Sequence, residues 1–370
     1  MISELALNVR PHEIRLAVLE NGLPVEYYIE RTVEPGLVGN IYRGRVLRVL
    51  PGMEAAFVDI GLDKAGFLYV SDVLPQIWDL NGEFVPLPSG RKEYRIEALL
   101  QQGQEVLVQV AREAISTKGP RVTTRITLAG HYLVLLPLFD YIGISRRIED
   151  EKERNRLRQI VAENKPEGIG FIIRTASEGV EPDKIIHEMK RLISLWQNIL
   201  EKKRNTPLPG LVYPEPDLCI RALRDFFGQD TKRLVVDDKQ AYERLLEYAE
   251  NFLPHFKHCL ELYQEEEPLF ERLGIERGIK QALQPTVSLK SGGYLVIEKT
   301  EALVVIDVNT GSFVGEDNLE ETIVQTNLEA AQEIAHQLRL RDLGGIIIID
   351  FIDMQKPEVK RQYCQLWKRP

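Results

Sequence analysis

Two aspartates end long apolar runs in the last third of the chain. Asp307 follows the run 303–306, and Asp350 follows the run 346–349. Continuous Ile/Val runs predict strands buried on both faces, where a carboxylate is costly unless something compensates its charge. If the two strands are parallel neighbours, both aspartates lie at the same sheet edge, where open α/β sheets bind ligands. Such a carboxylate pair suits Mg²⁺, which could activate water and stabilise charge on a phosphodiester.

The same residues also have a purely structural interpretation. Aspartate after a strand often caps the next turn, and spacing alone favours that role for Asp307 and Asp350. Asn309 lies on the same face of the extended chain as Asp307, and it could hydrogen-bond a phosphate oxygen or simply belong to the Asn-Thr-Gly turn. Asp353 is better explained as a residue that initiates a helix before Pro357 than as a metal ligand.

The segments that must position these aspartates form a βαβ unit. The predicted order is a strand over 302–308, a helix over 318–340, a strand over 345–351 and a helix from 357. A crossover of this kind makes the two strands parallel neighbours in one sheet.

Upstream of this unit, the pattern changes to short strands. The Asn-Gly pair at 21–22, between two apolar runs, predicts a hairpin over 13–29, because both turn residues need a positive φ. Short strands with Gly-rich turns between 36 and 125 predict a small β-barrel, interrupted by a Pro- and Gly-rich loop or insertion over 74–104. Apolar periodicity also predicts two helices, over 186–200 and 238–252.

The composition is that of an ordinary soluble globular protein. The chain has 370 residues, a net charge of −9, 44% hydrophobic and 28% charged residues. These values exclude a disordered chain, a coiled coil and a protein that coats nucleic acid by bulk charge. Three scattered cysteines provide no disulfide framework and no structural thiolate zinc site within this chain. Because no apolar run could span a membrane and no secretory signal is recognisable, we expect a cytoplasmic protein.

Several longer motifs resemble the bacterial ribonuclease E/G family and follow its order along nearly the whole chain. They lie at 143–149, 172–176, 267–270, 289–293, 302–309, 325–331, 337–345 and 349–354. The family consists of endoribonucleases that cut single-stranded, A/U-rich RNA. The resemblance implies Mg²⁺-dependent hydrolysis that leaves a 5′-phosphate and a 3′-hydroxyl. It matches the family's two Mg²⁺-binding aspartates to Asp307 and Asp350, and its asparagine at the scissile phosphate to Asn309.

The resemblance also implies an α/β fold of several subdomains. Residues 1–35 and 215–278 would form an RNase H-like scaffold without catalysis. Between them, 36–125 would form an OB-type RNA-binding barrel similar to that of the ribosomal S-one protein, and 126–214 a 5′-phosphate sensor. Residues 279–370 would form an incomplete DNase I-like catalytic subdomain.

On the barrel, the family's RNA-contacting aromatics match Phe57 and Phe67, and its nearby lysine matches Lys118. Aromatic side chains on such a barrel can stack bases, while lysine attracts phosphate. The residues alone leave a second interpretation open, because Phe57 is flanked by Ala56 and Val58 and could belong to the barrel core. Three arginines nearby are either a solvated strand face or part of the same groove: Arg43, Arg45 and Arg48.

The family also has a pocket for the 5′-monophosphate of RNA. Its arginine and threonine match Arg174 and Thr175, its second arginine matches Arg146, and a valine near the terminal base matches Val134. Arginine suits this role because its planar fork binds phosphate oxygens bidentately. From the residues alone, Arg146 is better explained as a surface side chain balanced by nearby acids. A bound 5′-monophosphate would raise the effective concentration of the downstream cleavage site.

Compared with the family, the chain stops early. The family continues with a cysteine pair that shares zinc between two subunits and with a small dimerisation domain. We therefore expect a truncated catalytic region, with zinc only in the missing part and homodimers or homotetramers only for full-length members. The expected partner is single-stranded RNA rather than DNA, in rRNA and tRNA processing or mRNA decay. The main alternative is an RNA-binding or scaffolding fragment without turnover, and a small-molecule phosphatase would leave the barrel unexplained.

Overall fold

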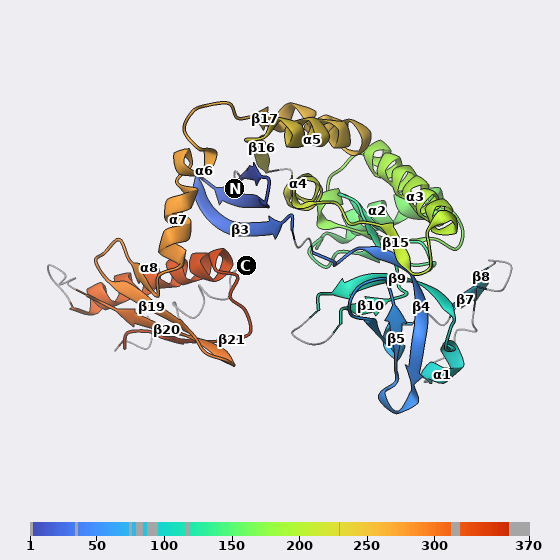
Figure 1. Cartoon of the computed structure of the whole chain (residues 1–370). Coiled ribbons are helices and arrows are strands. Elements are labelled where there is room, and N and C mark those ends of the chain that lie inside the picture. The colour runs from blue at the N-terminus through green and yellow to red at the C-terminus, as the bar shows by residue number, and fades with distance from the viewer. Residues whose placement is uncertain are drawn as a thin grey trace. The chain divides into compact units, whose positions relative to one another are not determined.

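The computed structural model describes residues 3–33, 36–73, 76–78, 84–86, 95–114, 119–228, 230–311 and 319–354. The chain divides into two compact units (Figure 1). Unit 1 comprises Met1–Ile29, Asp230–Leu246 and His258–Pro370, and unit 2 comprises Glu30–Gln229 and Glu247–Lys257. Both aspartates of the predicted metal site therefore belong to unit 1, whereas the predicted barrel and phosphate pocket belong to unit 2. No helix in the described part of the chain is long and apolar enough to cross a membrane.

A five-stranded sheet forms the first part of unit 1. Its elements are β1 (Ser3–Arg10), β2 (Glu13–Glu20), β3 (Leu23–Arg31), β16 (Thr231–Val236) and β17 (Leu260–Leu262), followed by the helices α6 (Leu269–Arg272) and α7 (Ile275–Ala282). The strand order is β17–β16–β1–β2–β3, so segments far apart in the sequence share one sheet. The predicted hairpin is confirmed: β2 turns into β3 at Asn21 and Gly22, whose φ angles are 52° and 80°.

A second sheet of unit 1 carries both aspartates. It contains β18 (Thr286–Ser288), β19 (Tyr294–Lys299), β20 (Leu303–Asn309) and β21 (Ile346–Asp350) in that order, and α8 (Leu319–Leu340) connects β20 to β21. The predicted βαβ unit is confirmed, because β20 and β21 pair in parallel. The helix predicted from 357 lies outside the described residues.

The predicted burial of these two strands on both faces is wrong. Ile346 and Ile348 of β21 are 64% and 50% exposed. Alternate side chains of a strand point to opposite sides, so an apolar run does not show by itself that both sides are covered. The covered side packs against α8 through five buried residues: Val304, Ile306, Val308, Ala330 and Ile334.

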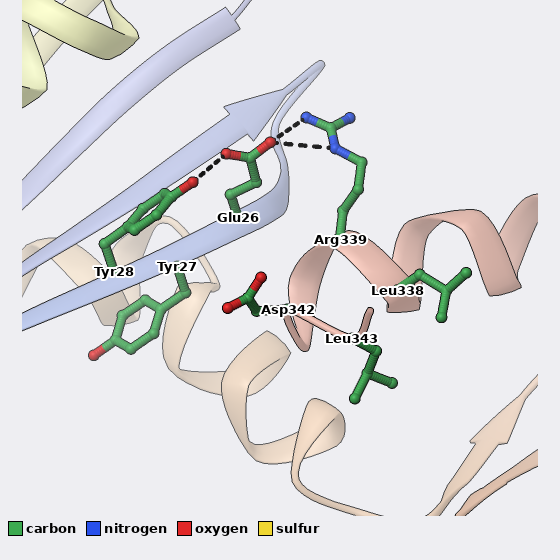
Figure 2. Close-up of a pocket in the computed structure, with 7 residues that line it drawn as sticks. All are labelled: Glu26, Tyr27, Tyr28, Leu338, Arg339, Asp342 and Leu343. Carbon is green, nitrogen blue, oxygen red and sulfur yellow. Dashed lines mark hydrogen bonds and ion pairs between the residues drawn. The ribbon is translucent and has the colours of Figure 1, made fainter. Parts of the chain in front are cut away.

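Within unit 1, the C-terminal end of α8 is tied to the β2–β3 hairpin. Arg339 Nη2 lies 2.9 Å from Glu20 Oε1 and 2.8 Å from Glu26 Oε1. Tyr28 donates a hydrogen bond to Glu26, and Figure 2 shows the contacts of Glu26 with Arg339 and Tyr28. Glu26, Tyr28 and Arg339 border a hollow of about 360 Å³. The residues that line it include none of the predicted site residues, so we assign this contact a structural role.

Unit 2 contains the predicted barrel. Its strands are β4 (Ile41–Leu50), β5 (Ala55–Asp59), β6 (Gly66–Tyr69), β9 (Glu105–Arg112) and β10 (Arg121–Thr123). The sheet order β4–β5–β6–β10–β9, with β9 pairing back to β4, closes the barrel, and β15 (Gly210–Tyr213) pairs with β4 from outside this ring. Gly44 allows a close strand approach, since a Cβ there would lie 2.6 Å from Val58 Cγ1.

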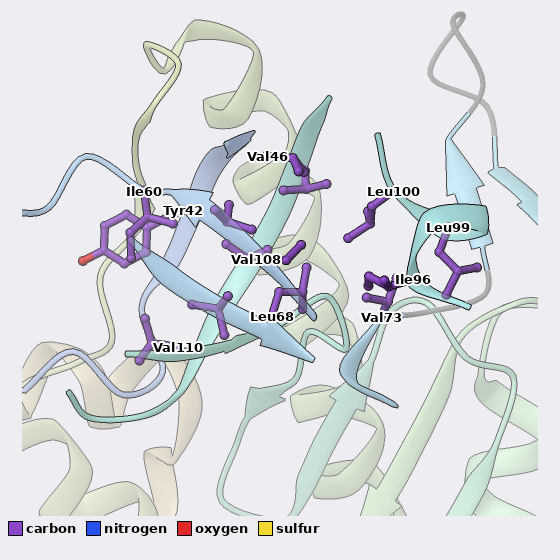
Figure 3. Packing of buried hydrophobic residues seen from close by; sticks show 14 residues of the cluster. Tyr42, Val46, Ile60, Leu68, Val73, Ile96, Leu99, Leu100, Val108 and Val110 are labelled. Atoms are coloured by element: carbon purple, nitrogen blue, oxygen red, sulfur yellow. The ribbon is translucent and has the colours of Figure 1, made fainter. Parts of the chain in front are cut away.

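The predicted loop over 74–104 contains three short elements. They are β7 (Gln76–Trp78), β8 (Phe84–Pro86) and α1 (Ile96–Leu99), and β7 pairs with β8 antiparallel. Ile96, Leu99 and Leu100 belong to the buried core of the barrel (Figure 3). The end of this segment is therefore part of the barrel's packing rather than a surface insertion.

A four-stranded sheet and two long helices form the rest of unit 2. The strands are β11 (Leu128–Ala129), β12 (Leu133–Leu136), β13 (Ile142–Ile144) and β14 (Gly170–Ile173), in the order β11–β12–β14–β13, and the helices are α2 (Glu151–Asn164) and α3 (Pro182–Asn205). The helices predicted over 186–200 and 238–252 are confirmed as α3 and α5 (Lys239–Phe252). Between them lie α4 (Leu218–Arg221) and a π-helical turn over Ala222–Phe226.

Candidate active site and binding surfaces

The structure brings the two predicted aspartates side by side. Asp307 near the end of β20 and Asp350 at the end of β21 are register partners in the parallel pair. Partners on neighbouring strands are about 4.8 Å apart and point to the same face. Because Ile306 and Val308 point toward α8, Asp307 points to the opposite, open face, and both aspartates are exposed. Neither carboxylate therefore bears the burial cost that the sequence pattern suggests.

This pair of carboxylates fits a hard, oxygen-preferring cation such as Mg²⁺. Mg²⁺ keeps several of its waters and takes one or two carboxylates together with substrate phosphate oxygens. Two exposed, adjacent carboxylates leave room for those waters and for a phosphodiester. Within the described ranges, no group of three or more His, Cys, Asp or Glu side chains could hold a metal ion.

Asn309 is directed at the same site. Its Nδ2 donates a hydrogen bond of 2.9 Å to Asp307 Oδ2, from the next outward position on β20. This contact places the asparagine on the aspartate face of the sheet. Asp353 is exposed and lies after the end of β21.

A buried asparagine on α8 holds the end of β21 in place. Asn327 is fully buried, its Nδ2 donates to the carbonyl oxygen of Ile352 (2.8 Å), and its Oδ1 accepts from the Ile352 amide (3.1 Å). This two-way contact fixes the backbone two residues beyond Asp350. Asn327 lies in the motif at 325–331, but the sequence does not predict its role, because its partner is a backbone group contributed by a separate segment.

Phe57 and Phe67 face each other on the outside of the barrel. They are register partners in the antiparallel pair of β5 and β6, with ring centroids 5.8 Å apart at an angle of 70°. Both are half-buried, while their neighbours Ala56, Val58 and Leu68 belong to the buried core. This alternation decides the question that the sequence leaves open: neither phenylalanine is a core residue.

Arginines lie next to this aromatic pair on the neighbouring strands, β4 on one side and β10 and β9 on the other. Arg48 pairs in register with Phe57, and Arg121 pairs with both Phe67 and Arg112. Arg48 and Arg112 are exposed, and Arg121 is ion-paired with Asp72 at 2.6 Å. Register partners share a face, so the two phenylalanines and the three arginines occupy one row of positions across the strands. Lys118, the remaining predicted RNA-binding residue of the barrel, lies outside the described residues.

Arg43, a third arginine of β4, is engaged elsewhere. Its Nη2 lies 2.7 Å from Glu105 Oε2, and its Nη1 donates to the carbonyl oxygen of Thr206. Glu105 also pairs with Lys203 at 3.1 Å. These contacts belong to the junction between the barrel and α3, so Arg43 is distinct from the row of arginines beside Phe57.

Arg174 and Thr175 line a hollow of about 430 Å³ at the end of β14. Arg174 Nη1 lies 2.8 Å from Asp225 Oδ1, and the same nitrogen donates to the carbonyl oxygen of Gly130. The hydroxyl groups of Thr175 and Ser145 are 2.8 Å apart. The remaining lining residues include Arg147, Ile172, Arg224 and Phe227.

The other two residues predicted for this pocket lie at its margin. Arg146 is exposed and does not line the hollow, whereas its neighbour Arg147 does. Val134 pairs in register with Ile172, which is a lining residue, so its backbone borders the wall of the pocket. In this arrangement Arg147 is the better placed of the two adjacent arginines.

One carboxylate lies among the arginines of this pocket. Asp225, on the π-helical turn, contacts Arg174 and lies 2.7 Å from Arg224 Nη2, and Arg224 also pairs with Glu215 at 2.7 Å. Burial acts to raise the pKa of Asp225, but Arg224 and Arg174 outweigh it and hold the pKa below its usual value. Asp225 and Arg224 were not predicted from the sequence, because no local pattern shows that this turn meets β14.

A buried glutamate lies beneath the same pocket. Glu188 on α3 is 1% exposed. Its Oε1 accepts the amide of His131 at 2.7 Å, and its Oε2 accepts the amides of Tyr132 and Leu133 at 2.8 Å each. Burial outweighs these hydrogen bonds and raises the pKa of Glu188 to about 7.

This raised pKa predicts a pH-dependent stability difference between the parent chain and Glu188→Gln. A carboxyl whose pKa is raised from 4.5 to about 7 stabilises the fold fully below pH 4.5, and this contribution is lost as pH rises to about 7. The free energy of unfolding of the parent minus that of the variant should fall across this window. Denaturant melts at several pH values measure it, and a flat difference contradicts it. His131, whose pKa burial lowers to about 4, contributes equally to both chains and cancels.

Comparison with known proteins identifies the family. The Ribonuclease E/G family matches residues 127–369. The chain is 47% identical over 365 residues to Ribonuclease G of Escherichia coli K12, covering 98% of this chain and 73% of that protein. Haemophilus influenzae Ribonuclease G is 46% identical with the same coverage, and Nostoc Ribonuclease E is 42% identical over 86% of this chain and 45% of its own length. The chain is therefore a member of the Ribonuclease E/G family.

Proposed function

We propose that this chain is an endoribonuclease that hydrolyses single-stranded, A/U-rich RNA and leaves a 5′-phosphate and a 3′-hydroxyl. The observation that carries the proposal is the register pairing of Asp307 with Asp350 on an open sheet face. The two carboxylates would hold Mg²⁺, which supplies an activated water and neutralises charge on the phosphodiester. Asn309, hydrogen-bonded to Asp307, is positioned to orient a phosphate oxygen. Membership of the family supports the same activity.

The barrel would hold the RNA on its aromatic row. Phe57 and Phe67 offer ring faces on which bases can stack, and Arg48 and Arg112 can contact the phosphates beside them. The net charge of −9 is compatible with this arrangement. RNA that binds along a short row of side chains needs positive charge at that row rather than on the whole protein. We include Lys118 in this surface on the basis of the family resemblance.

The pocket around Arg174 would bind the 5′-monophosphate of the RNA. A phosphate is a stronger partner for a guanidinium than a single carboxylate oxygen, since it accepts a bidentate pair of hydrogen bonds. It would take the place of Asp225 as the partner of Arg174, and the Thr175 hydroxyl would donate a hydrogen bond to a phosphate oxygen. We include Arg146 and Val134, which do not line the hollow, on the basis of the family resemblance, and Arg147 because it lines the wall. Holding one end raises the local concentration of the cleavage site.

The setting of this activity is also part of the proposal. We place it in the cytoplasm, in rRNA and tRNA processing and mRNA decay, with RNA rather than DNA as substrate. Full-length members of the family would assemble as homodimers or homotetramers. The subdomains would be an RNase H-like scaffold, an OB-type barrel, a 5′-phosphate sensor and a DNase I-like catalytic part, with the boundaries predicted above.

The test compares one labelled A/U-rich RNA with a 5′-monophosphate and with a 5′-hydroxyl, with and without Mg²⁺. We expect Mg²⁺-dependent cutting that is faster for the monophosphorylated RNA. Analysis of the product ends distinguishes hydrolysis to a 3′-hydroxyl from other routes. Binding without cutting would favour an RNA-binding protein, and failure to bind RNA would contradict both functions.

Arg174→Ala should remove most of the advantage of the monophosphorylated RNA. A charged hydrogen bond contributes about 1.5–3 kcal/mol, so we expect roughly a tenfold or greater loss in kcat/KM for this substrate. Cutting of the 5′-hydroxyl RNA should change little. Arg158→Ala, which removes an exposed arginine from α2 of the same unit, serves as the matched control. An unchanged preference in Arg174→Ala would exclude this pocket as the phosphate site.

A further inference from the structure

Residues 130–133, which lead into β12 beside the phosphate pocket, are held by hydrogen bonds to two different side chains. The Glu188 side chain accepts hydrogen bonds from three consecutive backbone amides, those of His131, Tyr132 and Leu133. Three converging N–H groups on one carboxylate form a backbone nest, an arrangement that fixes the local backbone rather than a single side chain. Residues 131–133 therefore cannot shift without breaking hydrogen bonds in a buried site.

The backbone carbonyl groups of the same segment hold Arg174. The Arg174 guanidinium donates to the carbonyl oxygen of Gly130. The backbone amide of Arg174 donates to the carbonyl oxygen of Tyr132 at 2.8 Å. The Tyr132 carbonyl oxygen also accepts from Ser177 Oγ at 2.8 Å. Amides and carbonyls of one short segment thus connect the buried carboxylate to the arginine of the pocket.

His131 extends this connection to the other wall. Its Nδ1 lies 2.9 Å from the carbonyl oxygen of Arg224, and the His131 ring itself lines the hollow. Arg224 and Arg174 share Asp225 between them. The segment anchored by Glu188 therefore contacts both arginines that hold the carboxylate in the pocket.

The close fit around Gly130 shows how tightly the segment is held. A Cβ at this position would lie 2.6 Å from Glu188 Cδ and 2.7 Å from its Oε2. These distances are shorter than real Cβ contacts allow, so a larger residue would displace the carboxylate or the segment. The same geometry offers two independent ways to disturb the contact, one from the glutamate and one from the glycine.

We propose that Glu188 is a positioning residue for recognition of the RNA 5′-end: through residues 130–133 it holds Arg174 in the orientation that binds the terminal phosphate. This inference rests on the proposed 5′-monophosphate pocket and adds a residue that does not touch the RNA. In its ionised form, which the raised pKa of Glu188 restricts to pH above about 7, the carboxylate is suited to the role because it accepts at both oxygens. Glutamine offers one acceptor oxygen, so its amide nitrogen would face either the His131 amide or the amides of Tyr132 and Leu133.

The experiment measures kcat/KM of the full chain for the two end forms of one RNA in Glu188→Gln. The advantage of the monophosphorylated RNA should fall about tenfold, while kcat/KM for the 5′-hydroxyl RNA stays within about twofold. Ile199→Ala is the matched control, because Ile199 is a buried residue of the same helix 11 positions farther along (199 − 188 = 11). It should lower stability and leave the ratio between the two RNAs unchanged.

A second variant and a second readout keep the result independent of folding losses. Gly130→Ala should reduce the same ratio with the glutamate intact. Hydrogen exchange at the amides of His131, Tyr132 and Leu133 should speed up in Glu188→Gln but not in Ile199→Ala. If Glu188 had only a structural role, Glu188→Gln and Ile199→Ala would both lower stability, and neither would selectively change the ratio between the two RNAs or the exchange at residues 131–133.

Three outcomes would overturn the proposal. An unchanged ratio in Glu188→Gln would show that the orientation of Arg174 does not depend on the carboxylate. An equal loss for both RNAs would indicate general damage. If the parent chain shows no preference for the monophosphorylated RNA, the proposed 5′-sensing and this inference both fail. The first two outcomes, in contrast, overturn only the role of Glu188.

Discussion

Asp307→Asn and Asp350→Asn should each reduce RNA cleavage by about a thousandfold or more. Each substitution removes one of the two carboxylates that we propose to hold Mg²⁺, and a bound metal ion contributes several kcal/mol to stabilising the transition state. Since about 1.4 kcal/mol is a factor of ten, a loss of about 4 kcal/mol corresponds to about 10³. The measurement is single-turnover cleavage of a labelled RNA in Mg²⁺.

Both variants should fold and bind RNA as the parent chain does. The two side chains are exposed and asparagine has nearly the same size, so packing under α8 is undisturbed. Glu301→Gln is the matched control, because it removes an exposed carboxylate from the turn between β19 and β20. Cleavage that continues at the parental rate in either aspartate variant would mean that the pair is not the catalytic centre.

Replacing both Phe57 and Phe67 by alanine should weaken binding of single-stranded RNA the most. Stacking contributes about 1–3 kcal/mol per base, so each ring accounts for roughly a 5- to 150-fold change in Kd. Because the rings contact each other with centroids 5.8 Å apart, the two losses should not add exactly as independent terms. Titration of a fluorescent single-stranded RNA at fixed salt measures the effect.

The barrel itself should remain folded in these variants. Neither ring belongs to its buried core, which consists of residues such as Val58, Leu68 and Val108. Leu47→Ala removes an exposed apolar side chain from the same barrel and should leave Kd unchanged. If Phe57→Ala and Phe67→Ala bind RNA as tightly as Leu47→Ala does, the aromatic pair is not the base-stacking surface.

Local signals predicted much of the fold because they act over a few residues. The Asn-Gly turn at 21–22 needs only the φ freedom of two residues, and the βαβ unit needs only its apolar periods and a right-handed crossover. The barrel was recognisable from short strands with Gly-rich turns. The burial of α1 in that barrel was not, because residues 74–104 carry loop-like composition along most of their length.

The chemistry of the candidate sites was also partly present in the sequence. Asp307 and Asp350 end their strands, and an extended chain puts Asn309 on the same face as Asp307. Phe57 was ambiguous, because alternation along β5 assigns two faces but does not say which one is inside. That choice depends on closure of the barrel, which buries Ala56 and Val58 and leaves Phe57 outside.

By itself, the sequence determined which residues can carry charge, bind phosphate or stack bases, and which short segments become strands or helices. Only the tertiary structure decided which of these residues meet. The pairing of Arg174 with Asp225, the place of Arg147 in the pocket wall and the amides gathered by Glu188 all join segments that are far apart in the chain. Such contacts arise from packing between whole elements, and local patterns hold no record of which elements pack together.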